Sequence, residues 1–421
     1  MSAQSFYTQF LSRRALRYQE SAIRALMPLS KAEGMISLAG GLPNPKLFPI
    51  TELKTTLRTG EEITMSSRRL QDSLQYSASY GLPDLVAWLK DYQKDLHSPP
   101  RSHGDWNICV TSGSQDGLYK AMDMLVDEND HILVEEPAYS GIVAALRPLH
   151  CNVVTVETDR HGIIPESLEK ILEGWPKETH SSRPRILYTI PTGQNPSGAT
   201  MTEERRRKVY SIAQRFNLLV LEDDAYFHLQ YVPQEERPKS LFSMDDDGRV
   251  LRFDSFSKVI ASGLRIGWVT GPTELVDRLQ LMQQASVMHA SGLSQGLVLT
   301  ILESMGRDGL NAHLAAVQEE YRQRRDKFCE LAEKHLTGLA EWSVPEAGMF
   351  VWFKLVGVID SFGLIKNEAL NEKVLLVPGA SFSFKKEPSP YVRASFSVAS
   401  YEDMDRGLER LANLLRKHTG K

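Results

Sequence analysis

The sequence predicts an α/β fold, with a mainly parallel sheet covered by helices on both faces, followed by a smaller α+β domain. Two observations lead to this fold class. Short apolar runs without polar alternation recur between residues 108 and 253, as expected for strands that are buried on both sides in a parallel sheet. Segments with helical apolar spacing lie between these runs, and such alternation is typical of α/β domains.

Each of five predicted strands ends in polar, turn-forming residues. The strands are 108–110 before TSGSQDG, 132–134 before EEPAYSG, 186–190 before PTGQNPSG, 218–221 before EDDAY, and 250–253 before DSFSK. Ligands of open α/β sheets bind beyond the carboxyl ends of the strands. We therefore expect the five polar segments to meet at a binding site.

Two of the connecting helices have a clear apolar face. Residues at i, i+3, i+4 and i+7 are apolar in 118–125 and again in 209–216, where Thr202 is a candidate N-cap. From about residue 312 the residue pattern changes. It predicts a long charged helix, two strand-like segments, GMFVWFKL and YVRASFSVA, and a closing helix after Ser400. We predict an N-terminal arm and part of the small domain in 1–50, a large α/β domain in 51–311, and a small domain in 312–421.

Composition favours a small-molecule partner. There are 49 basic and 53 acidic residues, with a net charge of -4, which argues against nucleic acid or a membrane surface. No apolar run approaches the roughly 20 residues of a membrane span. The three cysteines show no C-x-x-C spacing, so we predict neither a disulfide framework nor a metal site.

The N-terminus leaves two interpretations open. Residues 1–33 carry five basic and two acidic residues with several serines, a composition partly like a mitochondrial presequence. The same residues are equally consistent with an arm that packs on the enzyme. The location is therefore predicted as mitochondrial matrix or cytoplasm.

Lys258 lies in the segment DSFSKVIASGLRIGW, directly after a predicted strand. A lysine in such a place is usually an exposed cation. If the polar segments meet, however, the site contains an amine, acids, phenols, an amide, hydroxyls and an arginine. That set suits pyridoxal phosphate (PLP), which needs a lysine to hold its aldehyde as a Schiff base, an acid at its pyridine nitrogen, and donors for its phosphate.

Each requirement of this cofactor has candidates. Lys258 would hold the aldehyde, and Ser255, Ser257 and Arg265 would bind the phosphate. TSGSQDG would add backbone N–H groups at a helix start, although this turn taken alone is better explained as an ordinary strand-to-helix connection.

The ring of the cofactor has candidates too. A carboxylate ending a buried strand, such as Asp223, needs a cation, and a protonated pyridine is one. Tyr226 and Asn195 would bond the ring hydroxyl, and Tyr139 would stack on the ring. Taken singly, these residues also read as a helix-capping acid, a core tyrosine and a turn asparagine.

At this point the chain resembles fold type I PLP-dependent aminotransferases. The resemblance rests on NPSG (195–198), DDAY (223–226), SFSK (255–258) with GLR (263–265), and YVRASFS (391–397), in this order. The segments MISLAGGLPNPKLFP, LQYSASYGLPDL, VTSGSQDGL, EEPAYSG and LAEWSVPEAGMFVW are similar to the kynurenine/2-aminoadipate aminotransferase group. The likeness extends over nearly the whole chain.

The resemblance implies a homodimer with active sites at the subunit interface, and it implies a role for each matching residue. Lys258, Asp223 and Tyr226 would be catalytic, and Tyr139 and Asn195 would contact the cofactor ring. The phosphate would be bound by Ser114, Gln115, Ser255, Ser257 and Arg265, with Tyr76 from the partner subunit. Arg393 would bind the substrate α-carboxylate, and the other substrate contacts would be Asn195, Tyr76, Gly41, Leu42, Arg24 and Phe350.

The implied activity is transfer of the amino group of an L-amino acid to 2-oxoglutarate by a ping-pong mechanism. Donors would be 2-aminoadipate, kynurenine, aromatic amino acids or methionine. PTGQNPSG stands where the family pattern is PNGNNPTG, and DDAYFHLQY where it is DDPYYFLQF, so the preferred donor stays open.

Two other functions are alternatives to this activity. A PLP-dependent lyase acting on cysteine conjugates would use the same cofactor residues. The effector domain of a transcription regulator would need a DNA-binding module, for which the 33 or so residues before MISLAGG are too few.

Overall fold

The computed structural model describes residues 5–22, 33–36, 38, 41–100, 104–176, 183–385 and 387–420. The chain forms two compact units. Unit 1 comprises Met1–Asp127 and Asp245–Asn311, and unit 2 comprises Glu128–Met244 and Ala312–Lys421. Among the described residues, no helix is long and apolar enough to cross a membrane.

Three strands form the sheet segment of unit 1, in the order β3 (Trp106–Thr111), β10 (Gly267–Pro272) and β9 (Val250–Ser255). Strand β10 is antiparallel to both neighbours, so β3 and β9 run in the same direction. Gly267 pairs with Thr111 on one side and with Ser255 on the other. The polar segments that follow β3 and β9 therefore begin at the same end of the strands of unit 1.

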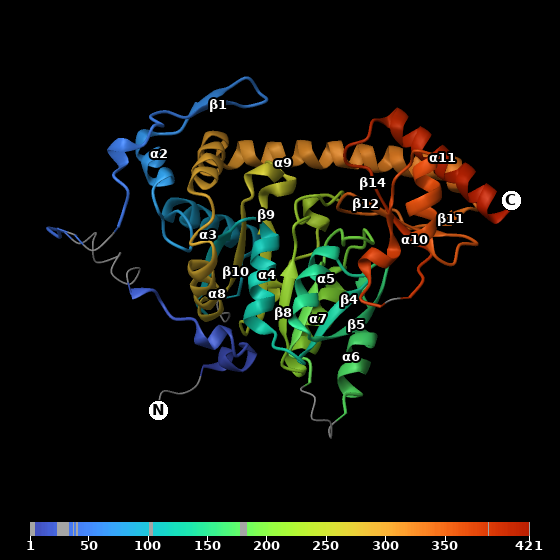
Figure 1. Ribbon diagram of the computed structural model, residues 1–421, viewed down its shortest axis with the longest axis horizontal. Helices are drawn as coiled ribbons and strands as arrows, with labels where there is room; N and C mark the ends of the chain where they lie inside the picture. The colour runs from blue at the N-terminus through green and yellow to red at the C-terminus, as the bar shows by residue number, and fades with distance from the viewer. Residues whose placement is uncertain are drawn as a thin grey trace. The chain divides into compact units, whose positions relative to one another are not determined.

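Helices α3 (Pro83–His97), α4 (Ser114–Leu125) and α8 (Thr273–Ser286) pack against these strands (Figure 1). The predicted apolar face of α4 is fully buried, since Leu118, Ala121, Met122 and Leu125 are at most 1% exposed. Unit 1 also contains the first part of the long helix α9 (Gly292–Leu336), described below, and these short elements: η1 (Phe6–Phe10), η2 (Ala15–Arg17), η4 (Pro45–Leu47), β1 (Lys54–Thr56), β2 (Glu62–Thr64), α2 (Ser67–Leu74), η9 (Phe256–Lys258) and η10 (Ser262–Leu264).

The N-terminal segment 5–22 packs against the rest of unit 1. The Tyr7 hydroxyl donates to the Gly248 carbonyl at 2.9 Å, and the Arg14 Nε donates to Asp123 at 2.8 Å. Phe10 is completely buried. Of the basic residues counted in the N-terminal stretch, Arg24 and Lys31 lie outside the described residues.

Unit 2 contains the parallel strands. They lie in the order β8 (Leu219–Asp223), β7 (Ile186–Thr189), β4 (His131–Glu136) and β5 (Asn152–Asp159), with the short antiparallel β6 (Gly162–Ile163) at the edge. The segments EEPAYSG, PTGQNPSG and EDDAY therefore all lie at the carboxyl ends of the parallel strands of unit 2. Helices α5 (Ser140–Leu146), α6 (Pro165–Glu173) and α7 (Glu203–Arg215) connect them, and Thr202 caps α7 as predicted.

A second, antiparallel sheet in unit 2 has the order β11 (Ala340–Glu341), β12 (Phe350–Leu355), β14 (Tyr391–Ser395) and β13 (Val377–Pro378). Both strand-like segments of the sequence are found here, and Ser400 caps α11 (Tyr401–Thr419) as predicted. The remaining short elements of unit 2 are η6 (Arg147–Leu149), η7 (Gln234–Glu236), η8 (Phe242–Met244), α10 (Ser361–Gly363), η11 (Leu364–Ala369) and η12 (Gly379–Phe382).

The long charged helix begins earlier than its sequence indicates. Helix α9 runs from Gly292 to Leu336 and is interrupted at Gly306, where φ is 61° (Figure 1). A positive φ is open to glycine without steric cost, so Gly306 permits the change of direction. The predicted charged helix is the second part of α9.

Candidate functional site

Lys258 ends η9, the single turn that follows β9 in unit 1, and it is half-buried. The Ser255 hydroxyl accepts a hydrogen bond from the Ser257 N–H at 3.1 Å, which stabilises the turn. Ser255 is buried, and Ser257 is partly exposed. The local sequence SFSK therefore places two hydroxyls and one amine on a turn that is anchored to a buried strand.

Arg265 joins this turn to the start of α4. Its Nη1 donates to the Ser257 hydroxyl at 3.3 Å and to the Ser262 carbonyl at 3.1 Å. Its Nη2 donates to the Ser112 carbonyl at 3.3 Å. The guanidinium therefore lies between the segments TSGSQDG and DSFSK, both of which were predicted to bind phosphate.

Gly113 is the N-cap of α4 and adopts φ 82°. A Cβ atom at Gly113 would overlap the Arg265 guanidinium, and a Cβ at Gly267 would overlap the Ser114 backbone nitrogen. These two glycines allow a guanidinium and a helix N-terminus to lie together. Ser114 and Gln115 form the first turn of that helix. Backbone N–H groups, hydroxyls and an arginine are the donor set that a phosphate dianion needs, so unit 1 fits the phosphate of PLP.

Asp223 is the last residue of β8 and is buried. The Tyr188 hydroxyl, on the neighbouring strand β7, donates to Asp223 Oδ2 at 2.7 Å. Burial raises the pKa of the phenols of Tyr188 and Tyr226, so both remain protonated donors at neutral pH. Tyr139 caps α5 at the carboxyl end of β4. A buried acid with neutral phenols nearby fits the polar groups of a pyridinium ring.

Arg393, on β14, is fixed by contacts within unit 2. Its guanidinium lies over the Phe350 ring at 4.1 Å and over the Phe382 ring at 5.0 Å, and its Nη1 donates to Asn195 Oδ1 at 2.8 Å. The buried Arg393 Nε has no hydrogen-bond partner among the described residues. Burial lowers the pKa of Arg393, yet a guanidinium stays charged in proteins. A guanidinium that is fixed in one orientation, with its Nε–H still available to donate, is suited to binding a planar carboxylate.

The remaining predicted residues have mixed placements. Phe350 is buried beneath Arg393. Tyr76, Gly41 and Leu42 are exposed in unit 1, where the Tyr76 ring meets His289 edge to face. Arg24 lies outside the described residues. The structure therefore brings Phe350, Asn195 and Arg393 together, and it leaves Gly41, Leu42 and Tyr76 on the surface of unit 1.

Three residues of these clusters were not singled out in the sequence. Tyr188 contacts Asp223, Phe382 contacts Arg393, and Gly113 makes room for Arg265. Tyr188 is a phenol within the apolar run ILYTI, which is a weak signal for a buried polar role. Phe382 gives no such signal, because its contact with Arg393 depends on tertiary structure alone.

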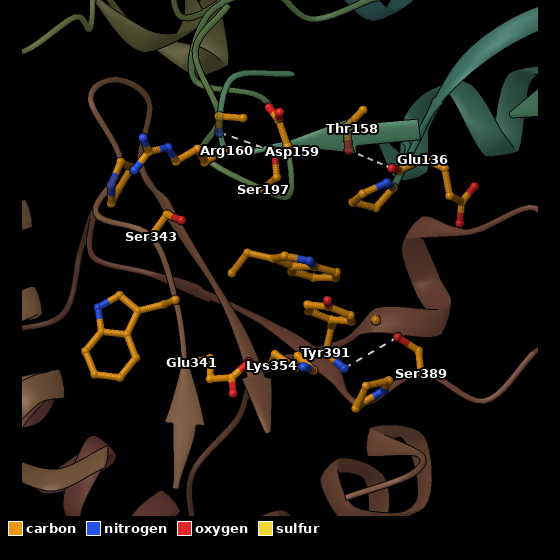
Figure 2. Close-up of a pocket in the computed structure, with 18 of the residues that line it drawn as sticks. Glu136, Thr158, Asp159, Arg160, Ser197, Glu341, Ser343, Lys354, Ser389 and Tyr391 are labelled. Atoms are coloured by element: carbon orange, nitrogen blue, oxygen red, sulfur yellow. Dashed lines mark hydrogen bonds and ion pairs between the residues drawn. The ribbon is translucent and has the colours of Figure 1, made fainter. Parts of the chain in front are cut away.

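A separate cavity of about 980 Å³ opens in unit 2. Figure 2 shows Thr158, Asp159 and Arg160 on one side, Ser197 from PTGQNPSG, and Lys354 and Tyr391 from the antiparallel sheet. None of the predicted site residues that the structure describes lines this cavity. In the described part of the chain no cluster of His, Cys, Asp or Glu could hold a metal ion, and the three cysteines are unpaired.

Comparison with known proteins gives consistent matches. The family description "Aminotransferase class I and II" matches residues 50–411. The mitochondrial kynurenine/alpha-aminoadipate aminotransferase of Bos taurus is 44% identical over 423 residues, which is 98% of this chain and 99% of the relative. The crystal structure of aminotransferase Aro8 from Candida albicans has a TM-score of 0.89 at 27% identity, with 99% of each chain covered.

A further solved structure contains a cofactor derivative. It is LysN, an alpha-aminoadipate aminotransferase from Thermus thermophilus, complexed with N-(5'-phosphopyridoxyl)-L-leucine. Its TM-score is 0.73 at 28% identity, with 98% of both chains covered. Together with the parallel strands of unit 2, these matches confirm the predicted α/β fold of the PLP-dependent transferases.

Proposed function

Because the chain belongs to the class I and II aminotransferase family, and so is a PLP-dependent aminotransferase, we propose that its amino donors are L-2-aminoadipate and L-kynurenine and its acceptor is 2-oxoglutarate. The observation that carries the proposal is the 44% identity to the bovine kynurenine/alpha-aminoadipate enzyme over nearly the whole of both chains. Aromatic amino acids and methionine are secondary donors in this proposal.

Unit 1 supplies the proposed phosphate ligands and the lysine. Ser114, Gln115, Ser255, Ser257 and Arg265 bind the phosphate, supported by the cluster of donors around Arg265. Lys258 holds the aldehyde carbon of the resting cofactor. When bound, PLP supplies an electron sink for the electron pair released from the substrate α-carbon.

Lys258 also acts on the substrate in this proposal. As a free amine, Lys258 would take the proton from the substrate α-carbon as a general base and would return it as a general acid. A short turn anchored on β9 keeps the amine in place for both tasks, because Ser255 bonds the Ser257 N–H. The same side chain therefore both takes up and returns the proton.

Unit 2 supplies the proposed ring contacts. Asp223 keeps the pyridine nitrogen protonated, which strengthens the electron sink, and the Tyr188 hydroxyl orients its carboxylate. Asn195 and Tyr226 bond the ring hydroxyl, and Tyr139 stacks on the ring. The neutral state of the Tyr226 phenol, which burial favours, supports its role as a donor.

Arg393 binds the α-carboxylate of every donor and acceptor. The two phenyl rings and Asn195 keep its guanidinium in one orientation, and its Nε still has a free donor among the described residues. Phe350, Gly41, Leu42 and Arg24 shape the side-chain pocket. A homodimer in which Tyr76 reaches the partner subunit's phosphate is part of the proposal, supported by the 50% exposure of Tyr76 in the single chain.

We also propose a mitochondrial location and the division into an arm with part of the small domain (1–50), a large cofactor-binding domain (51–311) and a small C-terminal domain (312–421). The bovine relative carries "mitochondrial" in its name, which supports the location. The contacts of residues 5–22 with unit 1 support an arm that packs on the enzyme.

The test is a donor panel with purified, PLP-loaded protein. Glutamate formed from 2-oxoglutarate is measured with 2-aminoadipate, kynurenine, phenylalanine and methionine, and pyruvate formed from a cysteine conjugate is measured with no acceptor. We expect the highest kcat/KM for 2-aminoadipate or kynurenine. A higher value for phenylalanine or methionine would contradict the substrate assignment, and pyruvate without glutamate would favour a lyase.

A further inference from the structure

Glu135 is a buried acid in unit 2 that the proposed mechanism does not use. It lies one residue before the end of β4 and is completely buried. It forms no ion pair with any residue that the structure describes. An ionised carboxylate in such a place is destabilised by several kcal/mol unless it is paired. The hydrogen bonds of Glu135 therefore have to stabilise its carboxyl group in place of an ion pair.

All three hydrogen-bond contacts of Glu135 go to the segment that follows β7. Its Oε1 accepts from the Thr189 hydroxyl at 2.5 Å, and its Oε2 accepts from the Ile190 N–H at 3.2 Å and from Gln194 Nε2 at 3.3 Å. Thr189 ends β7 and Gln194 directly precedes Asn195. Glu135 thus connects the strand end to the middle of PTGQNPSG.

Gln194 links Glu135 to the other residues of the loop by hydrogen bonds. Its Nε2 also donates to the Pro137 carbonyl at 2.7 Å, and its Oε1 accepts from the Ser197 N–H at 2.8 Å and from the Ser197 hydroxyl at 2.6 Å. The side chain is 1% exposed and every polar atom of its amide is used. Contacts on both sides of Asn195 therefore hold it, and Asn195 in turn accepts from Arg393 at 2.8 Å.

We propose that Glu135 is a positioning residue that acts through Gln194 on Asn195 and Arg393, and so sets the affinity of the site for substrate carboxylates. This inference rests on the proposed role of Arg393. The effective form we infer is the neutral acid. In that form the hydrogen of the short contact with Thr189 lies on Glu135 Oε1 and the Thr189 oxygen accepts it, while Oε2 still accepts from Ile190 and Gln194, so that no buried charge is needed.

The surroundings of Glu135 favour that neutral form. Burial raises its pKa to about 7; the hydrogen bonds from Thr189, Ile190 and Gln194 act in the opposite direction, and the charge of Asp223 adds a smaller upward contribution. Among the described residues, Asp223 on β8 and Tyr188 on β7 are titratable groups that interact with it, and from β5 Val156 pairs with it without bringing a charge. Ionisation would place two carboxylates in one buried region, and we infer that their repulsion shifts Glu135 relative to the loop.

The test measures binding of glutarate, a dicarboxylate with no amino or oxo group, to PLP-loaded protein by calorimetry between pH 6 and 8.5. Three proteins are compared: wild type, Glu135→Gln and Glu135→Ala. The amide of Glu135→Gln reproduces the neutral acid, with an NH₂ toward Thr189 and an oxygen toward Ile190 and Gln194. We expect wild type to lose about tenfold in affinity as pH rises through 7, Glu135→Gln to keep its affinity, and Glu135→Ala to bind about tenfold more weakly throughout.

Two controls separate this inference from its premises. Glu222→Gln changes another buried glutamate, whose carboxylate accepts from the Leu241 and Phe242 N–H groups, and it should keep the wild-type pH profile. Arg393→Lys should weaken glutarate binding at every pH. If Arg393→Lys weakens binding and Glu135→Gln titrates like wild type, only the present inference fails.

The other outcomes are also decisive. If Arg393→Lys binds glutarate like wild type, the proposed role of Arg393 fails and the inference fails with it. If Glu135→Ala does not fold, as judged by circular dichroism, the inference is tested by comparing the pH dependence of glutarate affinity in Glu135→Gln and wild type. Equal profiles would overturn the inference, and a flat profile in the variant alone would support it.

Discussion

Arg393 Nη1 donates to Asn195 Oδ1 at 2.8 Å, so the proposed substrate-carboxylate ligand and a proposed cofactor-ring ligand are bonded to each other. The pair joins β14 to the loop after β7, two segments that are 198 residues apart in the chain. A change at either residue should therefore alter how the enzyme holds both its substrate and its cofactor.

Arg393→Lys should weaken all amino donors alike. Lysine lacks the planar fork that binds a carboxylate through two parallel hydrogen bonds, so KM should rise by about tenfold to a hundredfold, with a smaller change in kcat. Steady-state kinetics with 2-aminoadipate and kynurenine check this. Arg406→Lys, on the exposed face of α11, is the matched control and should be neutral. An unchanged KM in Arg393→Lys would argue against carboxylate binding.

Lys258→Ala should still bind PLP, but weakly, and should lose turnover. Removing the proposed general base alone is expected to lower kcat by at least about 100-fold. Equilibrium dialysis of PLP and a coupled assay of glutamate formation measure the two effects separately. Lys366→Ala removes an exposed lysine and serves as the control. Normal turnover in Lys258→Ala would remove the basis of the assignment.

Gly113→Ala should reduce PLP affinity more than it reduces stability. Its Cβ would displace Arg265, while Gly60 has a similar positive φ and open space around it. Both alanine variants incur a backbone cost of about 1 kcal/mol. Only Gly113→Ala should weaken PLP binding, by about tenfold, because one charge-assisted contact to the phosphate is lost. Equal PLP affinity in the two variants would contradict the proposed phosphate site.

Stability should depend on pH through Glu135. Burial raises its pKa in the folded protein from 4.5 to about 7. Below pH 4.5 both folded and unfolded chains bind this proton, and between 4.5 and 7 only the folded chain does. The contribution to the free energy of unfolding is therefore full below the unfolded pKa and is lost as pH rises through the folded pKa, by about 3 kcal/mol.

Urea unfolding of wild type and Glu135→Gln across pH 5 to 8 checks this prediction. The amide does not titrate, so the difference in the free energy of unfolding between the two proteins should change with pH in the stated direction. A constant difference would show that Glu135 does not titrate in this range.

The sequence was sufficient for the strands that are continuous apolar runs, because burial on both faces favours apolar residues in the middle of β3, β4, β7, β8 and β9. Strand β10 was not predicted, since GWVTGP begins with glycine and ends with Gly-Pro, which are usual turn signals. In the structure those glycines have packing roles: a Cβ at Gly267 would meet Ser114, and one at Gly271 would meet Leu251. Strand β5 was also missed, because it is partly exposed and lacks a continuous apolar run.

The sequence identified candidate residues for the site, but it did not indicate how they contact one another. Residue types and order pointed to Lys258, Asp223 and Arg393, because each has a chemical task that few other residues perform. The contacts of Tyr188, Phe382 and Glu135 could not be predicted, since strand register and loop packing bring them to their partners. The position of Arg24 and the donor preference depend on segments whose sequence has no clear pattern.

The most direct test of the central claim is the half-reaction. The absorbance spectrum of PLP-loaded protein is recorded before and after addition of L-2-aminoadipate, with no acceptor present. An aminotransferase with this donor should lose the visible band of bound pyridoxal phosphate, gain the near-ultraviolet absorbance of pyridoxamine phosphate, and release one 2-oxo acid per site. A visible band that persists with 2-aminoadipate, and then with kynurenine, would contradict the account.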